Sequence, residues 1–195
     1  MLLLFMQSGG CKKAAYSSGD LLTKPLGGDR YLVVNTFGDG KLKVHVRQFE
    51  RRKTGVLYPT KAGVYFQPAR YAKLMALEPQ ITSTIQAELD GEDCESIKWH
   101  IGGGVYVAVS KDFDIANLRQ YFLPEDEQEI LPTKVGVTLK LDQWENTVNE
   151  LKALKEKFPE LANAQECDLS ADHANQTGYY DCKECSPFGT LTTSN

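Results

Sequence analysis

The chain has 195 residues and a net charge of −4, and its hydrophobic content of 42% and charged content of 25% are typical of a globular protein. This length suits one ordinary domain or two small ones. The longest apolar run, MLLLFM at residues 1–6, is far shorter than the ~20 residues that a membrane-spanning helix needs, and it lacks the charged region of a secretory signal. We therefore expect no membrane association, and we interpret this run as a tail, with a targeting role as the alternative.

The charges are unevenly distributed along the chain. Residues 24–87 hold eleven basic and four acidic side chains and sum to +7, whereas residues 88–97 sum to −5. Residues 98–160 sum to −3, and residues 161–195 sum to −4. Because local charge, more than total charge, governs attraction to a polyanion, the basic block is a candidate nucleic-acid-binding region.

Strand patterns open the basic block. Residues 31–37, YLVVNTF, are β-branched and aromatic and predict a strand. Residues 41–49, KLKVHVRQF, alternate between basic or polar and apolar side chains, which predicts a half-buried strand with a basic outer face. We expect a third short strand at residues 56–58, a turn at Pro59 and a fourth strand at residues 62–66.

The apolar spacing changes to a helical period at Pro68, which suits the first turn of a helix. Tyr71 and Leu74 fit one face of this helix. We expect Pro79 to kink or interrupt it. The acidic stretch at residues 90–97 then predicts a linker.

The same pattern recurs in the second half of the chain. Residues 106–113 and 117–122 predict strands, and residues 141–158 predict a helix. Between them, PTKVGVTL at residues 132–139 repeats PTKAGVYF at residues 59–66 after an offset of 73 residues. The acidic loop PEDEQE precedes the second copy of this segment. The Gly-rich IGGGVY precedes a strand and not a helix, so we interpret it as a flexible lead-in and not as a phosphate-binding loop.

The fold class that these patterns predict is α+β. Two tandem ββββα repeats are expected at residues 24–89 and 98–161, each a curved antiparallel four-stranded sheet followed by a helix, with an irregular cysteine-containing tail at residues 162–195. Units of this size bury too little surface to be very stable alone. We therefore expect the repeats to pair as an intramolecular pseudo-dimer, with pairing between chains in a homodimer as the alternative.

Both halves resemble the DNA-binding domain of the positive cofactor 4 transcriptional coactivators, over roughly residues 26–89 and 99–160. The shared features are RYLVV near the start, an aromatic residue closing that strand, VRQF ending the next strand, PxKxGV entering the fourth, and an aromatic residue early in the helix. The resemblance implies curved sheets that form a channel for single-stranded DNA, with the helices at the interface between the repeats. It also implies that this chain carries both halves of what is a homodimer in that family.

The resemblance and the charge pattern together predict a nucleic-acid interface. Single strands are bound by positive grooves with aromatic side chains that stack on bases. In the first repeat the candidates are Phe37, Lys41, Lys43, Arg47, Arg51, Arg52, Lys53 and Lys61. In the second repeat they are Lys111, Phe113, Arg119, Phe122 and Lys134. Two contacts of the family are missing, because its tryptophan at the end of the second strand falls at Glu50 and a second basic residue falls at Ala62.

The function expected from this resemblance is sequence-independent binding of single-stranded DNA by a nuclear transcriptional coactivator that is not an enzyme. RNA or the separated strands of a melted duplex are alternative ligands, and the transcription machinery is a possible partner. Because the second repeat is acidic, we expect the first repeat to provide most of the affinity. The alternative is a protein-interaction scaffold that keeps the fold but has lost nucleic-acid binding. No catalytic set stands out, since the three histidines lie in separate sequence contexts.

The tail leaves several alternatives open. Five cysteines in the chain, an odd number, favour free thiols and a reducing compartment. Cys167, His173, Cys182 and Cys185 could form a tetrahedral zinc site, since CKEC has a common ligand spacing. The intervals of five, eight and two residues between them are not those of a standard zinc finger. We expect a draped or irregular tail and no cofactor, with zinc binding and disulfide pairing as the alternatives.

Overall fold

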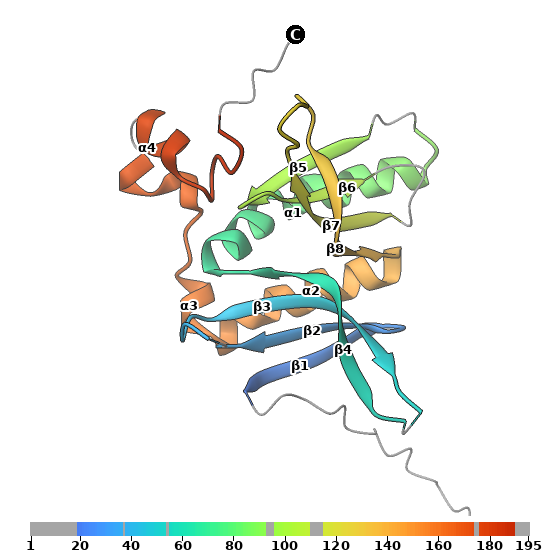
Figure 1. The fold of residues 1–195 in the computed structure, drawn as a ribbon. Coiled ribbons are helices and arrows are strands. Elements are labelled where there is room, and N and C mark those ends of the chain that lie inside the picture. Colours follow the sequence, from blue (N-terminus) through green and yellow to red (C-terminus); the bar gives the residue numbers. More distant parts are fainter. Residues whose placement is uncertain are drawn as a thin grey trace, which may run out of the picture.

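The computed structural model describes residues 19–36, 38–53, 55–92, 96–109, 115–173 and 176–189. It contains two four-stranded antiparallel sheets, and each sheet is followed by a helix (Figure 1). In both sheets the strands neighbour one another in chain order. The prediction of an α+β fold built from two ββββα units is therefore confirmed.

The element bounds are as follows. The first unit consists of β1 (Asp20–Gly27), β2 (Arg30–Asn35), β3 (Lys43–Arg51), β4 (Leu57–Phe66) and α1 (Pro68–Leu89). The second unit consists of β5 (Ile97–Gly102), β6 (Val105–Val109), β7 (Ala116–Phe122), β8 (Leu131–Leu139) and α2 (Leu141–Lys157). The short helices α3 (Pro159–Ala162), η1 (Cys167–Leu169), η2 (Ala171–His173) and α4 (Gln176–Asp181) follow, where the sequence predicts irregular structure.

The first strand of each sheet differs from the prediction. β1 contains Pro25 and lacks a clean alternation, and it lies at the edge of its sheet, where a missing backbone N–H is tolerated. β5 ends inside the segment IGGGVY, which forms a hairpin turn between β5 and β6 instead of a flexible lead-in. Gly103 and Gly104 in this turn have positive φ angles of 56° and 76°, which glycine adopts without strain.

Two prolines do not break the elements that contain them. β4 is one strand that runs through Pro59, where the sequence predicts a turn between two short strands. Pro59 pairs with Phe49 of β3, and the extra residues of a bulge in β4 follow it directly, so the ladder is already irregular there. α1 likewise continues through Pro79, because Leu74 and Ile81 are buried on both sides of it and hold the helix against the core.

The larger of two hydrophobic clusters among the described residues joins the two units. It contains buried side chains from all eight strands and from α1, α2 and α3, and the largest of them are Trp144, Tyr71 and Phe66. Tyr71 Oη donates a hydrogen bond to Leu151 O at 2.8 Å, and Trp144 Nε1 donates one to Thr82 Oγ1 at 3.2 Å, so the two long helices are also linked to each other.

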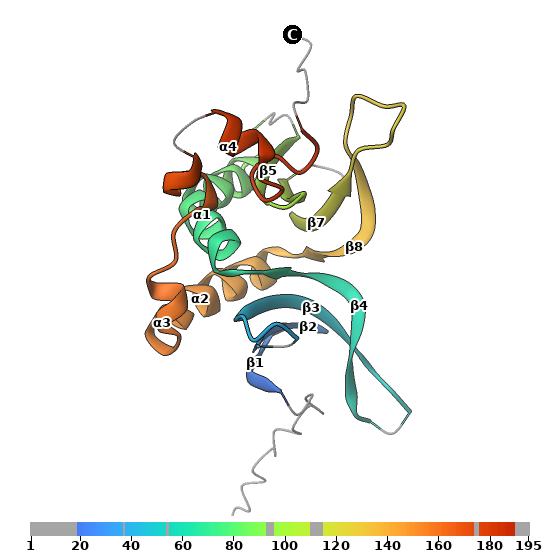
Figure 2. The same ribbon diagram turned by 60° about the vertical axis from the view of Figure 1, so that its left-hand side comes forward.

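Each long helix packs mainly on the sheet of the other unit. α1 contacts β5 and β6, whereas α2 contacts β1 and β2. Asn146 Nδ2 donates a hydrogen bond to Leu26 O, and Gln143 Nε2 donates one to Gly27 O, both at 3.1 Å. β4 and β8 also lie side by side at the centre of the molecule (Figures 1 and 2). These contacts fit the intramolecular pairing predicted from the sequence.

The hairpins β3–β4 and β7–β8 project on the side of the molecule away from α1 and α2 (Figure 2). Each sheet therefore has one face on the shared core and one face turned away from it. Within the described ranges, none of the helices has both the length and the apolar character needed to cross a lipid bilayer.

Candidate nucleic-acid interface

The repeated segment of the first unit itself contains a β-bulge. Residues 60–62 of β4 lie opposite Gln48 of β3, and Thr60 Oγ1 donates a hydrogen bond to Gln48 O at 2.9 Å. β3 and β4 then approach so closely that a Cβ atom at Gly63 would lie 2.8 Å from the Arg47 Cα atom. Glycine is therefore required at this position.

The second unit repeats this geometry. Residues 133–135 of β8 lie opposite Gln120 of β7, and Thr133 Oγ1 donates a hydrogen bond to Gln120 O at 2.8 Å. A Cβ atom at Gly136 would lie 2.9 Å from the Arg119 Cβ atom. The threonine and glycine of the segment are thus shared because both sheets contain the same bulge, which also bends each hairpin.

Alternate side chains of β3 lie on opposite faces of the first sheet. Val44 and Val46 are buried in the core, whereas Lys43, His45 and Arg47 lie on the face turned away from it. We call this second face the outer face of the first sheet. Along β3 this face is polar and basic, as the alternation of the sequence predicts, and on β2 it carries the apolar side chains of Val33 and Tyr31.

Hydrogen bonds connect the side chains of this outer face in a row. Asn35 Nδ2 donates to Asp20 Oδ1 at 3.2 Å, and His45 Nε2 lies 3.1 Å from Asn35 Oδ1. Arg47 Nη2 lies 3.4 Å from His45 Nδ1. These partners fit a neutral His45 with its proton on Nε2. Burial, and then the charge of Arg47, lower the pKa of His45 to about 4, so this ring is neutral at physiological pH and helps to orient Arg47.

Tyr65 is an exposed aromatic residue of β4 that the sequence analysis missed. It pairs with His45 across the two strands, so it lies on the outer face, and it is 41% exposed. Lys43 Nζ lies 6.0 Å from the centroid of its ring, and Arg70 Cζ lies 5.6 Å from it. Both cations are themselves paired, Lys43 with Asp39 and Arg70 with Glu184, whereas the exposed ring beside them can stack on a base. The alternation within β4 could have identified it, since Val64 and Phe66 are its buried neighbours.

Exposed cations lie on the β3–β4 hairpin, which we call the first hairpin, and on the residues just before β3. Five of the predicted binding residues are exposed there: Lys41, Arg51, Arg52, Lys53 and Lys61. Within the part of the chain that the structure describes, none of the five forms an ion pair with a carboxylate. Arg51 Nη1 donates a hydrogen bond to Gly55 O at 2.6 Å, and the Arg52 guanidinium lies 3.8 Å from the centroid of the Tyr58 ring. By contrast, Lys43 pairs with Asp39 at 3.0 Å.

The arginine on the outer face of the second sheet, the face turned away from the shared core, has different hydrogen-bond partners. Arg119 Nη1 donates a hydrogen bond to Thr133 O at 2.7 Å, and Arg119 Nε donates one to Asn117 Oδ1 at 3.0 Å. In the first sheet the corresponding Arg47 Nε is buried and has no hydrogen-bond partner among the described residues. More of the guanidinium nitrogens of Arg119 are therefore hydrogen-bonded to acceptors of its own sheet than is the case for Arg47.

The β7–β8 hairpin is acidic and apolar at its surface. Four acidic side chains are exposed in its loop: Glu125, Asp126, Glu127 and Glu129. Phe122 is 45% exposed, Leu131 41% and Val135 49%, and Phe122 pairs with Leu131 across the hairpin. Lys134 is also exposed beside them. This surface attracts phosphate less than the first hairpin does.

The predicted site residues therefore divide between the two sheets. Phe37, Lys111 and Phe113 lie outside the described residues, so these three stay predictions from the sequence. The structure also brings the four possible zinc ligands of the tail close to one another.

Comparisons with known proteins give one partial match. No protein-family model matches the chain, and no solved structure matches it. A curated protein of Caenorhabditis elegans, named "Putative RNA polymerase II transcriptional coactivator", is 31% identical over 62 residues. The match covers 31% of this chain and 50% of that protein, so the chain spans about half the length of the curated relative that it matches. The similarity is distant, and it extends over roughly the length of one repeat.

Proposed function

We propose that this chain binds single-stranded nucleic acid through the outer face of its first sheet and acts as a nuclear transcriptional coactivator without catalytic activity. The observation that carries the proposal is the exposed Tyr65 ring with Lys43 and Arg70 beside it, next to the row that contains His45 and Arg47. The distant similarity to a protein named as a transcriptional coactivator supports the same function.

The binding is independent of sequence in this proposal. Tyr65 stacks on a base, which contributes about 1–3 kcal/mol, and stacking tolerates every base because each has a π-face. The exposed cations of the first hairpin contact the phosphates, and such contacts position a strand without reading its bases. The paired repeats then hold a short single strand, or one strand of a melted duplex, mainly on the first sheet.

The second repeat contributes less affinity. Its arginine is hydrogen-bonded to neutral acceptors of its own sheet, and the loop at residues 124–129 carries four acidic side chains beside the exposed Lys134. Repulsion between this loop and phosphate weakens binding there. The second sheet serves mainly to complete the fold and to support the first.

A second candidate function is favoured by the exposed apolar side chains of the β7–β8 hairpin. Phe122, Leu131 and Val135 lie beside an acidic loop, a combination that suits a protein partner with an apolar and basic surface. In this alternative the chain is a protein-interaction scaffold.

The two lysines of the repeated segment offer a matched pair of variants. Lys61 and Lys134 occupy the same position in their segments and are both exposed. We expect Lys61→Glu to weaken binding of a fluorescent oligo-dT about three- to tenfold, because it reverses a phosphate-contacting charge. We expect Lys134→Glu to change the affinity less than about twofold. Fluorescence anisotropy at low salt measures both.

The same titration separates the possible outcomes. A larger loss from Lys134→Glu than from Lys61→Glu would contradict the assignment of binding to the first sheet. No measurable binding of the unmodified chain to oligo-dT would contradict the proposed function itself and would favour the scaffold alternative.

A further inference from the structure

Four side chains of the C-terminal segment converge on one point. The ligand atoms of Cys167, His173, Cys182 and Cys185 all lie within 4.8 Å of one another. They come from η1, η2 and the turn after α4, so three separate turns of the chain are brought together. The three cysteines are free thiols in this structure.

The distances within this cluster match those of a tetrahedral zinc site. Zn–S bonds of about 2.3 Å and Zn–N bonds of about 2.0–2.1 Å place two sulfur ligands about 3.8 Å apart, and a sulfur and a nitrogen ligand about 3.5 Å apart. The Cys167 and Cys182 sulfurs are 3.7 Å apart, and Cys185 Sγ lies 3.4 Å from His173 Nδ1. The set therefore has the chemistry that zinc requires, and two of its ligand pairs already have the spacing of a tetrahedral site.

The segment that carries the cluster has no apolar core of its own. Among its described residues between Ala162 and Gly189, Ser186 is the one buried residue, and Leu169 is 70% exposed. A stretch of this length is ordered only if something other than hydrophobic burial holds it, and a structural metal is a common solution in small modules. Metal binding by such a module contributes directly to the free energy of folding.

We propose that Cys167, His173, Cys182 and Cys185 bind a structural zinc ion. Four protein ligands close the coordination sphere, so the site leaves no position for a substrate. The three cysteines bind as thiolates and release three protons to solvent as the metal enters, and the neutral His173 binds through Nδ1. The proposal does not depend on nucleic-acid binding.

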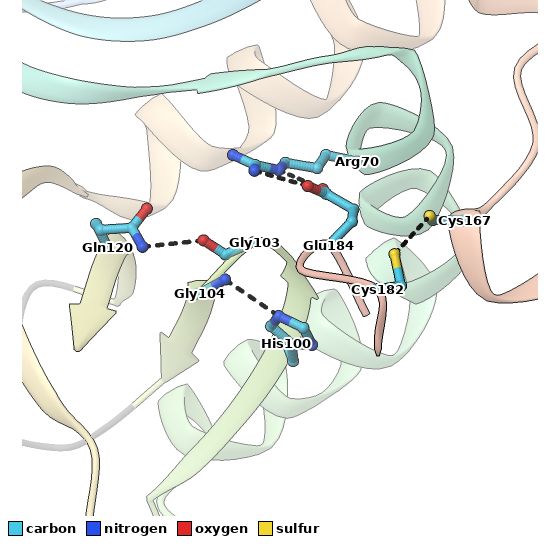
Figure 3. A network of polar contacts seen from close by, with 8 residues as sticks. All are labelled: Arg70, His100, Gly103, Gly104, Gln120, Cys167, Cys182 and Glu184. Atoms are coloured by element: carbon cyan, nitrogen blue, oxygen red, sulfur yellow. Dashed lines mark hydrogen bonds and ion pairs between the residues drawn. The ribbon is translucent and has the colours of Figure 1, made fainter. Parts of the chain in front are cut away.

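Zinc at this site would anchor the segment to the second sheet and to α1. Glu184, inside the CKEC motif, forms a two-pronged ion pair with Arg70 of α1, with Arg70 Nη2 2.8 Å from Glu184 Oε2 (Figure 3). Gly103 N donates a hydrogen bond to Glu184 O at 2.7 Å. A Cβ atom at Gly103 would overlap the Arg70 guanidinium, which explains the glycine run of the β5–β6 turn.

A second ion-pair contact lies on the other side of the cluster. Lys73 Nζ of α1 lies 2.8 Å from Glu166 Oε2 and 2.7 Å from Asp168 Oδ2, the two residues that flank Cys167. The metal would thus hold together two segments, residues 166–168 and 182–185, that each form an ion pair with α1. Release of the metal is expected to separate the two segments from each other while leaving the shared core intact.

Metal analysis of the full-length chain tests the proposal. We expect protein purified under reducing conditions to contain about one zinc ion per chain, and cobalt(II) to give the visible bands of a tetrahedral thiolate site. Cys185→Ser and His173→Ala are expected to lower the zinc content at least about tenfold. His173→Cys supplies a fourth thiolate and is expected to retain the metal. Cys94→Ser changes a cysteine of the acidic stretch at residues 90–97, is the control, and is expected to retain the metal fully.

Circular dichroism of each variant shows whether the two sheets remain folded, since the ligand residues contribute nothing to the shared core. Zinc well below stoichiometry in folded, fully reduced protein that also fails to bind cobalt(II) would overturn the proposal. A Cys167–Cys182 disulfide in protein purified without oxidant, or unchanged zinc content in Cys185→Ser, would overturn it as well.

Discussion

His45 and Asn117 occupy equivalent positions, each two residues before the arginine of its sheet. Both side chains contact that arginine, at 3.4 Å for His45 Nδ1 and 3.0 Å for Asn117 Oδ1. The asparagine of the second sheet cannot titrate, whereas burial lowers the pKa of His45 to about 4. Each sheet therefore orients its arginine with the side chain two residues before it. That side chain can titrate in the first sheet and cannot in the second.

The pH response of His45 gives the first prediction. Because its pKa falls from 6.5 in the unfolded chain to about 4 in the fold, His45 stabilises the fold above about pH 6.5, and this contribution is lost as the pH falls toward 4. Its share of the free energy of unfolding is expected to fall by about 2 kcal/mol between about pH 7.5 and pH 5. His45→Asn, which copies the second sheet, is expected to lose less stability over that range. Urea unfolding at both pH values measures the difference, and identical losses in the two proteins would contradict the burial of a neutral His45.

Tyr65 gives the second prediction at this scale. Tyr65→Ala removes the proposed stacking ring and is expected to weaken oligo-dT binding by about 1–3 kcal/mol, or about five- to 150-fold. Tyr65→Phe keeps the ring and serves as the matched control, with an expected change of less than about threefold. Titration by fluorescence anisotropy measures both affinities, and thermal unfolding checks that both variants are folded. Unchanged affinity in Tyr65→Ala would remove this residue from the interface.

Element by element, the helices and the central strands were predictable because their apolar periods are regular. Lys43, His45 and Arg47 alternate with buried valines, and the helical spacing after Pro68 is equally clear. β1 and β5 were missed because an edge strand with a proline and a strand ending in glycines lack that alternation. Pro59 was misread because its bulge depends on the partner strand, which local sequence does not reveal.

The candidate site could be predicted only in part, because it too depends on contacts that local sequence does not reveal. The basic residues of the first hairpin were evident from charge, but Tyr65 was missed because its exposure depends on which face of β4 meets the core. The cluster around Cys167 and Cys185 could be suggested by CKEC but not placed, because its geometry depends on how the short helices of residues 167–181 fold against one another. Sequence periodicity predicts elements, whereas contacts between elements decide the sites.

The exchange of helices between the two sheets gives a prediction about the units. α1 covers β5 and β6, so a fragment of residues 19–92 would expose the apolar face of α1 and one face of its own sheet. We expect this fragment to be unfolded, or to form a dimer in which two copies exchange helices, and not to fold as a monomer. Mixing it with a fragment of residues 93–195 is expected to restore the folded form.

Circular dichroism combined with light scattering distinguishes these states. The intact chain is expected to be monomeric, because its contacts between the units are satisfied within one chain. A cooperatively folding, monomeric fragment of residues 19–92 would contradict the shared core as the source of stability.

At the scale of the whole molecule, charge and fold give the two repeats different roles. The net charge of −4 conceals a basic first repeat and an acidic second repeat, and the shared core holds both in one body. The bulge, its threonine and its glycine recur in both sheets because the fold needs them. The exposed cations occur mainly on the first sheet, so most of the nucleic-acid affinity is proposed to lie there.

The salt dependence of oligo-dT binding tests the central proposal most directly. If the exposed cations of the first hairpin contact roughly four to five phosphates, the logarithm of the association constant should fall with the logarithm of salt concentration with a slope of about −3, at about −0.7 per phosphate. The titration extends from about 50 to 200 mM salt. We expect that slope in the unmodified chain and a shallower one in Lys61→Glu. Weak binding that does not change with salt would contradict the account.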